Sequence, residues 1–148
     1  MSSQEKLHKH IVALSRSKSW ASARTEWELN SIFQSDEPQT CPCGQHPIFE
    51  ICVIRNRVTG QATEVGNVCV NNFLMLPSTG LFRSIRYVRE DGNRSFSEEM
   101  IEYAHDRDII NDWERKFSLS IRKKRRLSGS QRNKKTQVNA KILTAITR

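Results

Sequence analysis

Two short cysteine-containing segments, separated by a stretch with the composition of a β-hairpin, constrain the fold of this chain most strongly. The first reads Thr-Cys-Pro-Cys-Gly-Gln-His over residues 40–46, and the second reads Val-Gly-Asn-Val-Cys-Val over residues 65–70. Zinc takes four nitrogen or sulfur ligands in a tetrahedron, and Cys41 and Cys43 offer two thiolates from one tight turn. Gly44 supplies the backbone freedom that such a turn needs. The spacing therefore predicts a metal-binding knuckle at the first segment.

The residues between the two segments predict where a third ligand comes from. Residues 47–55 are rich in Ile, Phe, Val and Cys, which is strand composition, and residues 56–60 form a turn sequence that ends in glycine. A hairpin centred on this turn pairs Cys52 with Val65 and returns the chain to the knuckle at Cys69. This cysteine also stands near an expected helix start, where the helix dipole favours a thiolate. We therefore expect Cys69 to be the third ligand.

The fourth ligand is open between two residues. His46 lies three residues after Cys43 and close to the expected position of Cys69. Cys52 lies nine residues after Cys43, which at about 3.3 Å per strand residue is about 30 Å away. Free cysteines are commonly buried as small apolar side chains, and Cys52 fits that description. We predict Cys41, Cys43, His46 and Cys69 as ligands of one structural Zn²⁺, with Cys52, another residue or water as the alternative fourth ligand.

The remaining histidines form no recognisable catalytic motif. The chain has four histidines and no His-Glu-x-x-His sequence, so a structural metal is favoured over a catalytic one. We expect His8, His10 and His105 to be surface residues. The simpler alternative is that the four cysteines are ordinary reduced core residues, because Cys-x-Cys is a weaker signal than the spacings typical of zinc sites.

Outside the cysteine region, the periodicity predicts mostly helices. Leu7, Ile11 and Leu14 recur at helical spacing, which predicts an amphipathic helix over about residues 3–16. A short strand is expected at residues 28–33.

Further helices are expected after Pro77. A stripe at i, i+3, i+7 and i+11 assigns four residues to the packed face of one of them, namely Ile110, Trp113, Phe117 and Ile121. Ser130 is expected to cap the last helix.

These elements predict an α+β fold, with a small zinc-stabilised β-hairpin core flanked by N-terminal and C-terminal α-helices. The 148 residues and 36% hydrophobic content suffice for a small core. We expect three regions: an N-terminal helical segment at 1–36, a zinc knuckle and hairpin module at 37–76, and a C-terminal helical region at 77–148 whose last two helices are basic.

The central region resembles a known class of zinc module. Cys-Pro-Cys-Gly at 41–44, Ile-Arg-Asn-Arg-Val-Thr-Gly at 54–60 and Val-Gly-Asn-Val-Cys-Val-Asn-Asn-Phe at 65–73 look like the treble-clef-type zinc modules of small phage and mobile-element proteins. The resemblance covers about residues 40–74. It implies a module that binds nucleic acid or protein, with two metal ligands from the knuckle and two from the helix start. Here the helix start offers one cysteine, Cys69.

The charge of the chain is placed very unevenly. The last 34 residues hold twelve of the 24 basic residues and none of the 16 acidic ones, so they carry +12 while the first 114 residues carry −4. A basic tail on a slightly acidic body is typical of a nucleic-acid-binding arm, whose affinity comes largely from phosphate contacts. The alternatives are a solvated helix face and a contact for an acidic protein.

The basic residues fall on two predicted helices joined by Leu-Ser-Gly-Ser at 127–130. We expect such a pair to form a clamp on phosphates, which would position a nucleic-acid backbone without reading its sequence. The predicted contact residues are Arg115, Arg122, Lys123, Lys124, Arg125, Arg126, Arg132, Lys134, Lys135 and Lys141.

Three functions are compatible with these features. The favoured one is a zinc-stabilised nucleic-acid-binding protein. The second is a small phage or mobile-element interaction protein that inhibits or adapts a host or defence protein complex, and the third is a small nuclease, for which no catalytic motif is present. No apolar run approaches the roughly 20 residues that span a bilayer, and the N-terminus lacks the apolar segment of a signal peptide. The expected location is therefore the cytoplasm, that of the host if the protein is phage-encoded.

Overall fold

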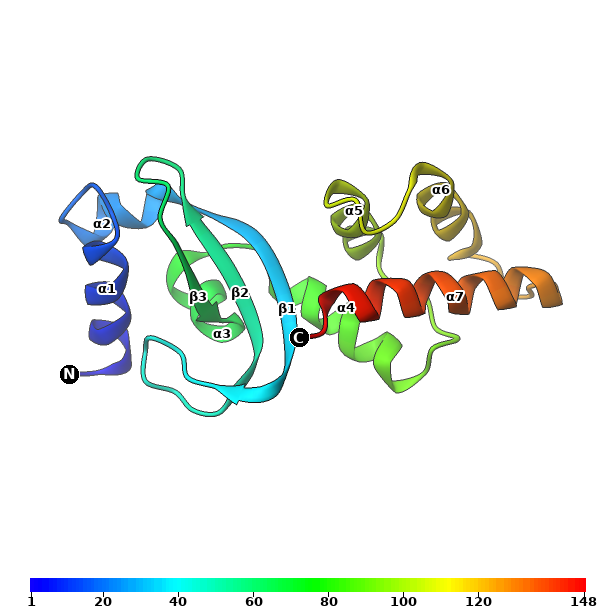
Figure 1. Ribbon diagram of the computed structural model, residues 1–148, viewed down its shortest axis with the longest axis horizontal. Coiled ribbons are helices and arrows are strands. Elements are labelled where there is room, and N and C mark those ends of the chain that lie inside the picture. The colour runs from blue at the N-terminus through cyan, green and yellow to red at the C-terminus, as the bar shows by residue number, and fades with distance from the viewer. The chain divides into compact units, whose positions relative to one another are not determined.

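The computed structural model describes residues 1–148 and divides them into two compact units, residues 1–79 with Arg148, and residues 80–147 (Figure 1). The first unit contains α1 (Ser3–Ala13), α2 (Trp20–Ala23), a 3₁₀ turn (Arg24–Glu26), β1 (Trp27–Gln39), β2 (Ile48–Asn56), β3 (Ala62–Gly66), α3 (Asn67–Cys69) and a π-helical turn (Val70–Leu74). The second contains α4 (Thr79–Glu90), α5 (Glu98–Asp106), α6 (Asp112–Ile121) and α7 (Gly129–Ile146). The predicted α+β class is confirmed.

The three strands form one antiparallel sheet in the order β1-β2-β3. Cys52 pairs with Val65, so the predicted hairpin register is confirmed. The turn forms because the side-chain Oδ1 of Asn56 accepts hydrogen bonds from the backbone N–H groups of Val58 and Thr59, at 2.8 and 2.9 Å. Gly60 completes it with a φ of 78°, a left-handed value that favours glycine.

Strand β1 is longer than the sequence predicts. Its 13 residues include the polar stretch 36–39, which lies beyond the strand predicted at residues 28–33. One edge of this stretch pairs irregularly with β2, and the other is joined by the last residue of the chain. The backbone N–H of Asp36 donates to the Arg148 carbonyl at 2.6 Å, and the Arg148 N–H donates to the Gln34 carbonyl at 2.9 Å. These two bonds satisfy backbone groups on the edge of β1 that faces away from β2.

Helix α1 begins at a capping box on Ser2 and presents Leu7 and Ile11, both fully buried, to the first unit. It also contacts the hairpin, since the Thr59 hydroxyl donates to the Leu14 carbonyl at 3.1 Å. The turn after α1 is held by Ser15, whose buried hydroxyl accepts from the Trp27 indole N–H at 2.9 Å. The N-terminal helix is therefore part of the same packed unit as the sheet.

The second unit packs the apolar faces of its helices together. The buried residues of α4 include Leu81, Phe82, Ile85 and Val88, and those of α7 include Val138, Ile142 and Ile146. Asn139 of α7 donates to the carbonyls of Gly92 and Arg94 at 3.0 and 2.8 Å, which holds the turn after α4. Helix α7 is capped by Ser128, not by Ser130, because Gln131 completes a capping box with Ser128.

The predicted packed face of α6 is partly wrong. Ile110 and Ile121 are buried, but Trp113 is 56% exposed and Glu114 is buried in its place. Glu114 accepts from the Lys141 ammonium of α7 at 2.8 Å and from the Asn111 N–H at 2.9 Å. These bonds turn the carboxylate inward and leave Trp113 at the surface.

None of the helices combines the length and apolar character that a bilayer-crossing segment requires.

Candidate metal centre and basic surface

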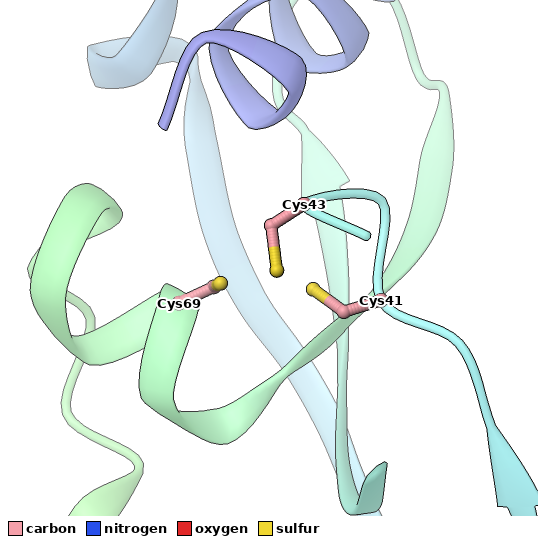
Figure 2. A group of neighbouring side chains, drawn as sticks. All are labelled: Cys41, Cys43 and Cys69. Atoms are coloured by element: carbon pink, nitrogen blue, oxygen red, sulfur yellow. The ribbon is translucent and has the colours of Figure 1, made fainter. Parts of the chain in front are cut away.

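Three cysteines from distant parts of the first unit meet at one point. The Sγ atoms of Cys41, Cys43 and Cys69 all lie within 4.8 Å of one another and point toward a common centre (Figure 2). The three residues are 2%, 2% and 5% exposed. All are free thiols. Two come from the loop between β1 and β2, and the third comes from α3 directly after β3.

The loop that carries Cys41 and Cys43 folds as a tight knuckle. The Gly44 N–H donates to the Cys41 carbonyl at 2.8 Å, and the Cys41 N–H donates to the Gln45 carbonyl at 3.0 Å. Gly44 has a φ of 97°, which confirms that this turn needs glycine. The hairpin then brings Gly66 close enough for its N–H to donate to the Cys41 sulfur at 3.5 Å. The register of the hairpin is what places Cys69 beside the knuckle.

The surroundings of the three sulfurs favour thiolate at Cys41. A hydrogen bond from the Cys69 thiol, helped by backbone N–H groups at Cys43 and Gly66, lowers the pKa of Cys41 to about 5 despite its burial. The pKa of Cys69 is correspondingly raised, because its thiol is the donor to Cys41 and is itself buried. The pair therefore shares a proton between two close sulfurs, and a bound cation would replace that proton.

The arrangement has the chemistry of a zinc site with three sulfur ligands. A Zn–S distance of about 2.3 Å places the sulfurs of a tetrahedral site about 3.8 Å apart, so the three thiols lie close to the spacing that one ion requires. Buried free thiols that converge from two segments are compatible with a metal that fixes the knuckle to the helix start. These three residues could hold the ion, and they leave one coordination position for a fourth ligand.

Cys52 lies outside this group. It is fully buried in β2, and burial raises its pKa to about 11 even though a hydrogen bond with Ser78 opposes the shift. A thiol with a raised pKa is a poor metal ligand and a poor nucleophile. Cys52 is therefore a core side chain in this structure.

His46 also lies outside the group of three sulfurs. Its side chain is exposed, and its Nδ1 lies 2.8 Å from the Thr40 hydroxyl and 3.1 Å from the Gln39 carbonyl oxygen. Metal-bound histidines usually donate their second ring N–H to such a partner, which leaves the other nitrogen for the ion. These contacts engage Nδ1 and leave Nε2 without a hydrogen-bond partner, and the role of His46 as fourth ligand stays a prediction.

His10 is a residue near the centre that the sequence analysis assigned to the surface. It is half-buried, and its Nε2 lies 2.8 Å from the Thr63 hydroxyl of β3. Burial lowers the pKa of His10, and the negative charge of Cys41 opposes this shift, so the ring lies within electrostatic reach of the knuckle. Lys6, one turn earlier on α1, has its Nζ 3.3 Å from the position of a Cβ on Gly44. The helical spacing of Lys6 and His10 was the available signal, but nothing local indicates what they face.

A second group of metal-binding residue types lies in the second unit and is accounted for by its neighbours. Glu102 forms an ion pair with Arg115 at 2.8 Å, and His105 contacts Asp112 at 2.6 Å. Because these side chains are partly exposed and have protein partners, we assign no metal to them.

The predicted phosphate-binding residues divide into engaged and free side chains. Arg115 pairs with Glu102, Arg122 donates to the Phe96 carbonyl at 3.0 Å, and Lys141 pairs with Glu114. Lys134 lies over the Trp113 ring, and burial lowers the pKa of Lys135. Five further side chains are exposed and have no partner within the chain, and we call them the basic segment: Lys123, Lys124, Arg125, Arg126 and Arg132.

No protein-family model, curated protein or solved structure matches the chain.

Proposed function

We propose that this chain is a zinc-stabilised nucleic-acid-binding protein. In the first unit, a structural Zn²⁺ joins the knuckle to α3. In the second unit, the basic segment contacts phosphates. The observation that carries the proposal is the basic segment itself: five exposed cations that no carboxylate neutralises, gathered in the α6–α7 connection and the first turns of α7.

The zinc part of the proposal is supported by the order of elements. A two-cysteine knuckle, a β-hairpin and a short helix with a cysteine in its first turn follow one another along the chain. This order is what the resemblance to treble-clef-type zinc modules implies. A structural role for the metal is supported by the burial of the three cysteines, whose sulfurs would be the ligands. His46 completes the proposed ligand set.

The nucleic-acid part is supported by the contrast between paired and unpaired charge. Glu102 pairs with Arg115 and Glu114 pairs with Lys141, so these two carboxylates do not neutralise the basic segment. Unpaired exposed cations repel one another and gain little from the folded chain, whereas a phosphate backbone releases counterions when they bind it. Contacts of this kind predict affinity without strong sequence preference.

The matched test compares two double substitutions that remove the same charge. We expect Lys123→Gln with Lys124→Gln to weaken binding of a fluorescent duplex DNA oligonucleotide and to reduce the slope of log affinity against log salt by about 1.8, because each phosphate contact with a duplex contributes about 0.9. Lys9→Gln with Arg55→Gln, two exposed cations of the first unit, serves as the control and should change the slope little. Equal effects of the two pairs, or no binding by the unmodified protein at low salt, would contradict the proposal.

A protein partner is a second candidate, favoured by two exposed apolar side chains in the segment that follows β3. Val68, next to Cys69, is 59% exposed, and Met75 at the end of the following π-helical turn is 73% exposed. Exposed apolar groups of this kind are typical of docking surfaces when they cluster. Capture of one stoichiometric protein by the tagged chain after nuclease treatment, lost on Val68→Asp, would favour this function over the first.

A further inference from the structure

The second unit carries a stacked pair of aromatic rings, one of them exposed and the other half-buried. Trp113 and Phe117 lie one turn apart on α6, with ring centroids 5.1 Å apart and ring planes inclined by 8°. We call this stacked pair the aromatic platform. Trp113 is 56% exposed, whereas Trp27 in the first unit is 3% exposed. A tryptophan left at the surface gives up the stabilisation that burial of so large an apolar side chain provides.

Cations flank the platform. The Lys134 ammonium of α7 lies 5.1 Å from the centroid of the Trp113 ring, within the range of a cation–π contact. Lys116, exposed and three residues after Trp113, lies on the same side of α6. The nearest carboxylates on this helix are engaged, Asp112 with His105 and Glu114 with Lys141.

This combination matches the chemistry of an unpaired nucleotide. A base has a flat π-face that stacks on an exposed indole, and its phosphate needs a nearby cation. Lys134 is well placed for exchange, because its flexible chain can leave the ring and contact a phosphate while a base takes its place over the indole. In a duplex the faces of the bases are covered by their neighbours, so the platform cannot use them.

We propose that the aromatic platform binds single-stranded nucleic acid by stacking a base on Trp113, with Lys134 and Lys116 contacting the adjacent phosphates. This rests on the proposed nucleic-acid function and adds the ligand class to it: single strands are bound in preference to duplex. The basic segment supplies affinity for any phosphate backbone, and the platform supplies the discrimination.

The test uses two strands that differ only in their bases. A fluorescent oligothymidine and an abasic strand of equal length carry the same phosphates, and only the first can stack. We expect the full-length protein to bind the oligothymidine about 10-fold more tightly than the abasic strand, in line with the usual value of one stacked base. Trp113→Ala should abolish this difference, and Trp113→Phe should keep part of it.

Each other outcome has a defined meaning. If Trp113→Ala binds the oligothymidine as well as the unmodified protein does, the platform is not the site, although the proposed function stands. If a matched duplex binds as tightly as the single strand, and Trp113→Ala weakens the binding of both probes equally, the proposed preference for single strands is wrong. If the unmodified protein binds none of the three probes at low salt, the proposed function fails, and this inference with it. Unchanged circular dichroism of Trp113→Ala is expected, since an exposed side chain has been removed.

Discussion

The two units of this protein are closed in different ways. In the first unit, the loop after β1 and the helix after β3 meet at the buried sulfurs of Cys41, Cys43 and Cys69. These three thiols would repel one another if all were ionised. The second is held by apolar helix faces, capped helix starts and the carboxylate–ammonium pair of Glu114 and Lys141. The difference is that the three thiols of the first unit could hold a metal ion, whereas the carboxylates Glu102 and Glu114 of the second unit are paired with protein cations.

The largest effect should follow from removing one of the three sulfurs. We expect Cys69→Ser to lose the metal and to expose the knuckle and α3, since structural zinc in small peptides is worth about 10–16 kcal/mol of folding free energy. Hydrogen exchange on the full chain measures this: amides of the knuckle and α3 should exchange faster, while those of α4–α7 keep their protection. Elemental analysis gives the metal content.

Cys52→Ser is the matched control for this substitution. It removes a buried sulfur from the same unit, so it should destabilise the core modestly, by about 1–3 kcal/mol for a buried hydroxyl in place of a thiol. The metal content should stay unchanged. Loss of metal on Cys52→Ser, or full protection of the knuckle in the metal-free protein, would remove the distinction between the two units.

A smaller effect is expected at the fourth ligand. His46→Ala should weaken metal binding by at least about 10-fold, because even the outer partners of metal ligands are worth about 10–100-fold. His10→Ala is the control, since its ring is also close to the knuckle but hydrogen-bonded to Thr63. Cobalt substitution measures both, as the visible spectrum reports the number of sulfur and nitrogen ligands. A spectrum altered by His10→Ala and not by His46→Ala would assign the position to α1.

The local features of the fold could be predicted from the sequence. The hairpin register follows from a turn with Asn56 and Gly60 at fixed positions, and the knuckle follows from the glycine after the second cysteine. In both cases the residues that determine the backbone conformation lie within a few positions of one another, so the local sequence is enough to predict it.

The features that were missed depend on residues far apart in the chain. Strand β1 extends because Arg148 pairs with it, and Trp113 is exposed because Glu114 finds Lys141 on another helix. His10 lies near the knuckle because it meets Thr63 across 53 positions. A periodic apolar stripe identifies a helix but does not say which of its flanks a distant partner will cover.

The smallest expected effect tests the second unit. Burial alone would raise the pKa of Glu114, but hydrogen bonds from Lys141 and the Asn111 N–H outweigh burial and lower this pKa. A carboxyl whose pKa is lowered on folding stabilises the folded state above its unfolded value of about 4.3. That contribution is lost as the pH falls through the folded pKa. Glu114→Gln keeps the shape but weakens both bonds, so we expect a loss of about 1 kcal/mol at pH 7. Between pH 7 and pH 3, hydrogen exchange of α6 and α7 should then depend less on pH than in the unmodified protein. An unchanged pH dependence would mean that the apolar faces alone close this unit, and that the carboxylate–ammonium pair contributes nothing to the contrast with the first.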